Sequence, residues 1–349
     1  MTDVKTTTTL QDAVDDGFDA QVALTAELTR FPSLRGQEAT AQDFMAGQMR
    51  ARGLDVDRFR IDLDRIRHLP GFSPVHVDYD NAWNVVGTYR AEAPTGKSLI
   101  LNGHIDVVPE GPVAMWTSPP FEPRREGDWL YGRGAGDMKA GLVACLAALD
   151  AIDRAGFEPT ADICVQSVIE EECTGNGALA CLERGYRADA VLIPEPLHEC
   201  LIRAQIGVIW FRVTVQGIPV HVADAGEGAN AIMAGYEVMK ALQGLEAEWN
   251  ARKVDDADFR DVAHPINLNV GKITGGDWAS SVPSWCEFDL RVSIYPGQAI
   301  AEAKAEIEAT IARAARDIPF LRNNPPEITY NGFEAEGYRL QDATAPVAA

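Results

Sequence analysis

The sequence predicts an α/β fold in which a mostly parallel sheet is flanked by helices and a smaller α+β domain is inserted in it or appended to it. Two observations lead to this prediction. Between about residue 84 and residue 196, strand-like apolar runs alternate with helix-like segments, which is typical of a parallel sheet covered on both faces. From about residue 205 the order becomes strand, helix, strand, strand, helix, which indicates a smaller domain with an antiparallel sheet.

The first half of the chain contains the strands and helices that predict the parallel sheet. Residues 17–52 carry apolar side chains three and four positions apart around a break at Pro32, and they predict helices. SLILNGHIDVV predicts a buried strand, and MKAGLVACLAALDAIDRAG predicts the helix that follows a loop rich in Pro and Gly. ADICVQSVIEE and ADAVLIPEP predict two more strands, separated by the helical NGALACLERG.

The second half predicts the smaller domain. IGVIWFRVTVQGIPVHV is a long alternating strand, and residues 229–252 form a long amphipathic helix. INLNVGKITGG and CEFDLRVSIYPG are strand-like, and residues 298–317 predict another helix. We therefore expect a first domain over residues 1–204, a second over residues 205–325, and the start of a return to the first domain over residues 326–349.

Composition restricts the partners. The chain has 349 residues, 46% of them hydrophobic and 24% charged, as in a globular protein. A net charge of −21 argues against nucleic acid or an anionic membrane as a partner. We expect no signal peptide, because the N-terminus is polar, and no membrane span, because no apolar run approaches roughly 20 residues. Six scattered cysteines without a CxxC pair are typical of a cytoplasmic protein with reduced thiols.

Metal-type ligands stand where the predicted strands end. His104 and Asp106 follow one strand, residues 170–172 are three glutamates after another, and Glu195 follows a third. Asp137 closes the loop GRGAGD just before a helix. Taken singly, a strand-end histidine is more often structural, a glutamate triplet more often solvated, and an aspartate before a helix more often an N-cap. Together at one edge of one sheet they would repel each other, and divalent cations relieve that repulsion.

At these residues the sequence resembles the M20 metallopeptidase family, which includes acetylornithine deacetylases, succinyl-diaminopimelate desuccinylases and aminoacylases. The matching stretches are NGHIDVVP, the WxxxPF segment at residues 116–121, YGRGAGDMKAG, EEECTGNGA, IPEP, GIPVHV with GANAI, and DLRVSIYPG. Each stretch alone is weak, but the combination is specific and covers most of the chain from about residue 20.

The resemblance implies two divalent metal ions. His104 and Glu195 would bind one ion, Glu172 would bind the other, and Asp137 would bridge them, often with a cis peptide just after it. Imidazole and carboxylate ligands fit Zn²⁺ best, with Co²⁺ or Mn²⁺ as plausible replacements.

The resemblance also implies metal-assisted hydrolysis of an amide. Asp106 would orient the imidazole of His104, as metal-bound histidines require. Glu171 would be the general base that takes a proton from water and later gives it to the leaving amine. In the inserted domain, His221 would stabilise the oxyanion, and Arg291 would hold a substrate carboxylate. An exposed structural histidine and a sheet ion pair are the ordinary alternatives for these two residues.

Two further expectations concern assembly and the end of the chain. The resemblance implies that the inserted α+β domain is a lid/dimerisation domain, whose helix at residues 229–252 would form a homodimer contact. The family has one more metal-binding histidine near its C-terminus, whereas the last histidine here is His264, so we expect a truncated chain. His198, three residues after Glu195, is a possible substitute ligand.

The leading hypothesis is hydrolysis of the amide bond in a small N-acyl amino acid or related amide, in the manner of a deacetylase. Dipeptidase or carboxypeptidase, desuccinylase and formyl-amide hydrolase activities remain open within the same chemistry. From another class, the chain would be an inactive truncated remnant that binds metal or dimerises. The presence of Glu171, His221 and Arg291 argues against a remnant, since one would be free to lose them.

Overall fold

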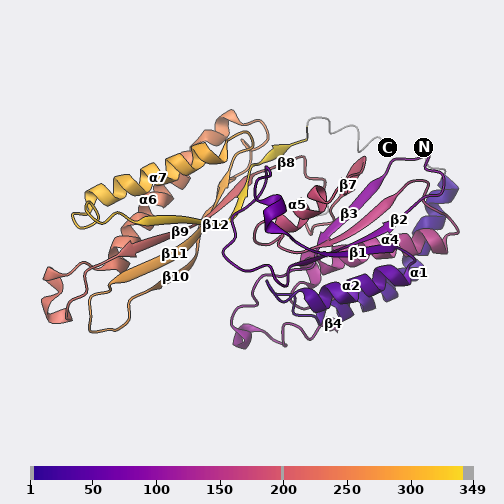
Figure 1. Cartoon of the computed structure of the whole chain (residues 1–349), viewed down its shortest axis with the longest axis horizontal. Helices are drawn as coiled ribbons and strands as arrows, with labels where there is room; N and C mark the ends of the chain where they lie inside the picture. The colour runs from indigo at the N-terminus through magenta and orange to yellow at the C-terminus, as the bar shows by residue number, and fades with distance from the viewer. Residues whose placement is uncertain (1–3, 198–199, 341–349) are drawn as a thin grey trace. The chain divides into compact units, whose positions relative to one another are not determined.

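A computed structural model describes residues 4–197 and 200–340. They divide into two compact units (Figure 1). The first unit contains residues 4–72, 77–197 and 200–201, and the second contains residues 73–76 and 202–340. None of the described helices has both the length and the apolar character needed to cross a membrane.

The first unit is built on a five-stranded mixed sheet with the order β1-β2-β6-β3-β7. Its central strand β6 pairs in parallel with β3, and β3 pairs in parallel with β7. On the other side, β2 runs antiparallel to both β6 and β1. The strands are β1 (Asp55–Arg60), β2 (Trp83–Tyr89), β3 (Leu99–His104), β6 (Ile163–Val168) and β7 (Ala190–Leu192).

Helices cover this sheet through apolar contacts. The long helices of this unit are α1 (Val4–Thr29), α2 (Ala39–Ala51) and α4 (Gly141–Arg154). The unit also contains the shorter helices α3 (Leu63–Ile66) and α5 (Asn176–Glu183). Helix α2 packs on β1 and β2, α4 packs on β3 and β6, and α1 packs on α4 (Figure 1). Fully buried Leu28, Met45 and Leu142 show that each long helix contributes to the core, and burying a side chain of this size contributes about 1.5–3 kcal/mol.

The connections in this unit bring three strand ends to one edge. The chain passes from β3 through α4 to β6, and from β6 through α5 to β7. Since β3, β6 and β7 are parallel, their carboxyl ends lie on the same side, with His104 opposite Val168 and Leu101 opposite Leu192. The loop between β3 and α4 carries the hairpin of β4 (Arg124–Glu126) and β5 (Trp129–Tyr131), followed by the irregular helix η2 (Ala135–Ala140).

The α/β prediction is confirmed for β3, β6 and β7. The antiparallel β2 and the edge strand β1 were not foreseen. Strand β1 has the sequence DVDRFR, in which only Phe59 is buried, so it carries no apolar run that would reveal it. Its place is set by pairing with β2 rather than by its own composition.

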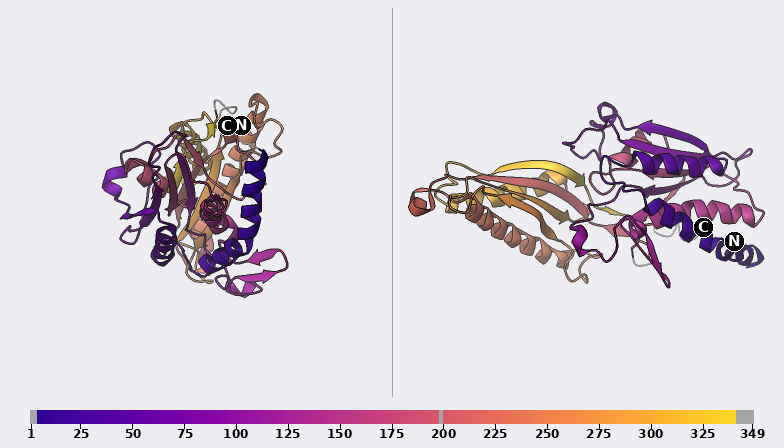
Figure 2. Two further views of the ribbon diagram at one scale, coloured as in Figure 1. Left: turned by 90° about the vertical axis from the view of Figure 1, so that its right-hand side faces the viewer. Right: turned by 90° about the horizontal axis from the view of Figure 1, so that it is seen from below.

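The second unit is a four-stranded antiparallel sheet with the order β10-β11-β9-β12. The strands are β9 (Gly207–Gln216), β10 (Leu268–Gly275), β11 (Trp285–Ile294) and β12 (Glu327–Ala335). Helices α6 (Ala231–Ala251) and α7 (Ile300–Asp317) lie side by side on one face of it, as the views in Figures 1 and 2 agree. Strand β9 buries alternate residues against them, including Phe211.

The last described strands differ from the sequence prediction. Residues 326–349 were expected to start a return to the first domain, but β12 pairs with β9 in the sheet of the second unit. The reason is visible in the register, because Ile328 lies opposite Val213 and Tyr330 opposite Phe211, and both pack on the core of this unit. The short β13 (Tyr338–Arg339) then pairs with β8 (Ala204–Gln205).

Candidate metal centre

The residues predicted to bind metal in the first unit meet at the carboxyl edge of its parallel strands. His104 is the last residue of β3 and its side chain is 1% exposed. Glu171 and Glu172 follow β6, Glu195 follows β7, and Asp137 lies in η2 just before α4. A topology in which neighbouring parallel strands end together therefore collects side chains that are up to 91 positions apart, from 104 to 195.

One imidazole nitrogen is the centre of this cluster. His104 Nε2 lies 3.1 Å from Asp137 Oδ1, 3.7 Å from Glu195 Oε1 and 3.8 Å from Glu171 Oε2. Among the described residues, two triads present ligand atoms that all lie within 4.8 Å of one another, namely His104–Glu171–Glu195 and His104–Asp137–Glu172. Both triads share His104, so they form one centre.

The other imidazole nitrogen, Nδ1, contacts the second residue after the strand. His104 Nδ1 lies 2.8 Å from the main-chain oxygen of Asp106, and 3.6 Å from the Asp106 carboxylate. A proton on Nδ1 satisfies this carbonyl, so that Nε2 would be available to bind a cation through its lone pair, which is the arrangement of a metal-binding histidine. The orienting contact that we predicted for the Asp106 carboxylate is thus made at shorter range by its backbone.

The Asp106 carboxylate connects two of the loops. Its Oδ2 accepts a hydrogen bond of 3.1 Å from the main-chain N–H of Glu172. Its Oδ1 is buried and accepts no hydrogen bond from the described part of the chain. A buried carboxylate oxygen without a donor is costly, unless a positive charge nearby compensates it.

The pKa values in the cluster reflect the burial of several carboxylates close to one another. Burial, followed by the charge of Asp137, raises the pKa of Glu172 to about 7. Burial also raises the pKa of Glu195 to about 7 and raises the pKa of Glu171. The hydrogen bond from His104 lowers the pKa of Asp137. Burial lowers the pKa of His104, but its interactions with Asp106 and Asp137 outweigh burial and raise this pKa to about 11.

These observations fit divalent metal. His104, Asp137, Glu172 and Glu195 offer one imidazole nitrogen and three carboxylates, a chemistry that suits Zn²⁺, Co²⁺ and Mn²⁺, and Glu171 adds a fourth carboxylate beside them. Burial raises the pKa of Glu172 and Glu195 to about 7, and a bound cation would displace their protons. The side chains of Asp137 and Glu171 are 59% and 46% exposed, so the centre is open to a small molecule from solvent.

The backbone around Asp137 agrees with the family resemblance. The Asp137–Met138 peptide bond is cis, as expected for the residue at this position. Gly141, at the start of α4, allows the helix to approach the main chain just before Glu195, because a Cβ there would collide with the carbonyl oxygen of Pro194.

His221 and Arg291, which we predicted to act on the substrate, belong to the second unit. His221 is exposed at the N-terminus of η3 (Val222–Glu227), where its Nδ1 accepts a hydrogen bond from Ala223 N at 3.1 Å. Arg291 lies on β11, and its Nη1 donates to Ser293 Oγ at 3.1 Å. Among the described residues, no carboxylate forms an ion pair with Arg291, whereas Arg212 on the neighbouring strand is paired with Asp289. Burial lowers the pKa of Arg291.

His198, considered as a substitute ligand, lies outside the described residues.

Sequence reasoning missed several residues behind the centre. Arg35 forms a two-pronged ion pair with the buried Glu170, the first member of the glutamate triplet. Tyr79 donates to the same carboxylate. Lys139, two residues after Asp137, is fully buried and donates to the carbonyl of Phe31. A buried carboxylate such as Glu170 needs a positively charged partner. The glutamate triplet therefore indicated that a basic side chain lies nearby, but nothing in the neighbouring sequence pointed to Arg35.

Comparison with known proteins agrees with the fold and identifies the family. The family described as "Peptidase family M20/M25/M40" matches residues 100–334. The chain is 30% identical over 337 residues to N-formyl-4-amino-5-aminomethyl-2-methylpyrimidine deformylase of Halalkalibacterium halodurans, covering 91% of this chain and 73% of the relative. It is also 30% identical over 305 residues to succinyl-diaminopimelate desuccinylase of Stenotrophomonas maltophilia, covering 84% of this chain and 73% of the relative.

A solved structure shows the same fold. A di-peptidase from Saccharomyces cerevisiae superposes with a TM-score of 0.75 at 14% identity, covering 98% of this chain and 82% of that one. At this identity the likeness concerns the fold alone.

Proposed function

The chain belongs to peptidase family M20/M25/M40, and we propose that, as a metal-dependent amide hydrolase, it cleaves the acyl amide of a small N-acyl amino acid. One observation carries the proposal. Three carboxylate oxygens from three different loops lie within 3.8 Å of the buried Nε2 of His104. So much negative charge around one imidazole serves no evident structural purpose, and it suits a pair of divalent cations, with Zn²⁺ as our first choice.

The proposed roles follow the geometry of the chain's own residues. When bound, two such cations supply Lewis acidity for the amide carbonyl and for water. His104, Asp137, Glu172 and Glu195 would hold them. Glu171 is the most suitable general base, because burial raises the pKa of its carboxyl toward the range in which it can both accept and return a proton. It would take a proton from water and deliver it to the leaving amine.

Arg291 supports a substrate with a free carboxylate. Its guanidinium is half-buried and, among the described residues, lacks an anionic partner. A bidentate arginine–carboxylate contact is one of the stronger and more selective contacts available to a protein. We propose this role for Arg291, with His221 as donor to the oxyanion.

A second candidate substrate is a formyl amide of a heterocyclic amine. It is favoured by the deformylase relatives from Halalkalibacterium halodurans and Bacillus subtilis, which match 91% and 93% of this chain. Such a substrate needs no carboxylate, so it would leave Arg291 without its proposed task.

A substrate panel tests the proposal. The purified chain, with Zn²⁺, Co²⁺ or Mn²⁺ added, is assayed for amine release from N-acetyl, N-succinyl and N-formyl amino acids, a formylated aminomethylpyrimidine and dipeptides. We expect the highest kcat/KM on an N-acyl amino acid. Preference for the formylated pyrimidine would select the second candidate, and no turnover on any amide would contradict the function.

We also propose a homodimer formed through α6, in a cytoplasmic protein. Met233 and Tyr236 lie three positions apart on this helix and are 57% and 53% exposed, so together they offer an apolar patch to a partner. All six cysteines are free thiols, as expected in a reducing compartment. Light scattering coupled to size exclusion would show a mass twice that of the chain, and Met233→Glu with Tyr236→Lys would return it to a monomer.

A further inference from the structure

Glu170 is the first residue of the glutamate triplet, and its carboxylate is bound by residues outside the metal-binding triads. Its carboxylate is 2% exposed, and Arg35 grips it with Nε at 2.5 Å from Oε1 and Nη2 at 2.7 Å from Oε2. Tyr79 and Thr174 donate their hydroxyls to Oε2 at 2.5 and 2.9 Å. Four donors thus fix both oxygens of a side chain that is no part of either metal-binding triad.

The backbone of Glu170 is fixed as firmly as its side chain. Among the described residues other than glycine, it alone has a positive φ, of 65°. Its carbonyl oxygen accepts hydrogen bonds from the main-chain N–H groups of Thr174 at 2.9 Å and Gly175 at 2.7 Å. This turn lets Glu170 face Arg35 while the next residue, Glu171, faces Nε2 of His104. A change in the direction of Glu170 would therefore change the direction of the carboxylates that follow it.

The segment that supplies Arg35 contacts three loops of the centre, which are the loops that carry Asp106, Asp137 and Glu171. Among the described residues, it makes no hydrogen bond with the loop after β7. We call residues 31–35 the brace. Ser33 Oγ donates to the carbonyl of Ile105 at 2.5 Å, between His104 and Asp106. Ser33 in turn accepts from Val107 N at 3.0 Å. Lys139 Nζ donates to the carbonyl of Phe31 at 2.7 Å, next to the loop of Asp137.

We propose that Arg35 and Glu170 are positioning residues that set the affinity and geometry of the metal centre. The inference rests on the proposed function, because it concerns the same centre. Neither side chain belongs to the metal-binding triads, so both act through the turn that carries Glu171 and Glu172. The hydrogen bonds of the brace also hold the loops of His104 and Asp137 in place relative to that turn.

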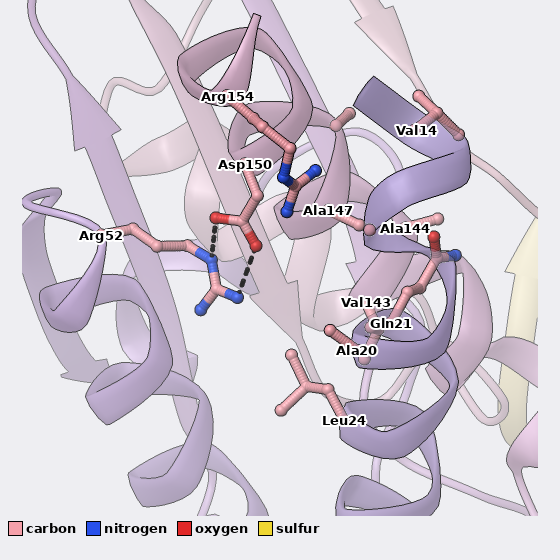
Figure 3. A pocket seen from close by; sticks show the side chains of 12 residues that line it. Val14, Ala20, Gln21, Leu24, Arg52, Val143, Ala144, Ala147, Asp150 and Arg154 are labelled. Atoms are coloured by element: carbon pink, nitrogen blue, oxygen red, sulfur yellow. Dashed lines mark hydrogen bonds and ion pairs between the residues drawn. The ribbon is translucent and has the colours of Figure 1, made fainter. Parts of the chain in front are cut away.

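A purely structural ion pair is the competing explanation, and the first unit contains a matched control. Arg52 grips Asp150 with the same two-pronged geometry, at 2.8 Å for both contacts (Figure 3). This pair lines a cavity of about 310 Å³ between α1 and α4, and Asp150 lies in the C-terminal half of α4, away from the end near Asp137. Its loss should affect stability without reaching the metal-binding loops.

The experiment compares matched variants of the full chain. Metal-free wild type, Glu170→Gln, Arg35→Lys, Asp150→Asn and Arg52→Lys are titrated with Co²⁺, and the visible absorption bands, the affinity and the Tm are recorded. We expect Glu170→Gln and Arg35→Lys to weaken Co²⁺ binding about 10–100-fold and to alter the bands, as is typical for residues that orient metal ligands. We expect Asp150→Asn and Arg52→Lys to keep wild-type affinity and bands, even where the Tm falls equally.

The outcomes separate the inference from the function on which it rests. Wild-type affinity and bands in Glu170→Gln and Arg35→Lys, with only the Tm lowered, would make this a structural ion pair and overturn the inference alone. A wild type that binds no Co²⁺ would overturn the proposed function and the inference with it. If Glu170→Gln does not fold, Tyr79→Phe decides, since it removes one donor and keeps the ion pair. A smaller weakening of Co²⁺ binding would support the inference, and unchanged binding would contradict it.

Discussion

His104 and Asp137 are 33 positions apart in the sequence, yet Nε2 of the imidazole lies 3.1 Å from Oδ1 of the carboxylate. His104 belongs to both metal-binding triads, so its removal should affect the whole centre.

We therefore expect His104→Ala to lose its metal and to lower kcat/KM by roughly 10³-fold or more, since Lewis acidity contributes several kcal/mol to such reactions. Metal content by elemental analysis and amide hydrolysis are measured together. His76→Ala is the control, because His76 is exposed in the second unit and contacts the carbonyl of Tyr330. Full metal content in His104→Ala would show that the centre lies elsewhere.

Glu171 should matter for the chemical step and Glu172 for metal retention. We expect Glu171→Gln to lower kcat about 10²–10⁴-fold, the usual contribution of a general base, while its metal content and KM stay near those of wild type. Glu172→Gln should instead lose metal. A Glu171→Gln protein with near-normal kcat would remove Glu171 from the role of base.

Arg291 should select substrates that carry a carboxylate. Hydrogen bonds to charged groups contribute about 1.5–3 kcal/mol, so Arg291→Met should lower kcat/KM for an N-acyl amino acid roughly 10–100-fold. The matching amide without the carboxylate should react as before. Arg212→Lys is the control on the same sheet, since Arg212 already pairs with Asp289. An equal loss on both substrates would contradict carboxylate recognition by Arg291.

Glu38 should make the free energy of unfolding depend on pH. This residue is 1% exposed, its Oε2 accepts no hydrogen bond from the described residues, and burial raises its pKa from 4.5 to about 7. Because the folded state holds this proton more tightly than the unfolded state, stability falls as the pH rises from 4.5 through about 7.

Glu38→Gln should abolish this loss. We expect the variant to gain on wild type progressively over that interval, by up to about 3 kcal/mol at pH 8, a limit set by the pKa difference. Urea unfolding at pH 5, 6, 7 and 8 gives the comparison. A stability difference that does not vary with pH would show that Glu38 ionises normally in the folded protein.

The sequence predicted what local patterns encode. Apolar runs that end in His104, Glu171 and Glu195 indicated parallel strands, and the topology confirms that these ends share one edge. The acidic character of the strand ends then led directly to a metal centre.

What the sequence did not reveal depends on distant partners. Arg35 and Glu170 are 135 positions apart, and neither carries a sign of the other. Strand β12 contains Ile328 and Tyr330 in alternation, which fits a strand in either unit, and only its pairing with β9 decides between them.

Metal-dependent amide hydrolysis by the cluster around His104 is most directly tested by removing and restoring the metal. The chain is stripped with a chelator, its metal content is measured, and hydrolysis of an N-acyl amino acid is followed as Zn²⁺ is added back to wild type and to Glu171→Gln. Our account predicts up to two ions bound by both proteins, with activity that returns in wild type alone. Full activity in the metal-free chain, or equal activity in Glu171→Gln, would contradict it.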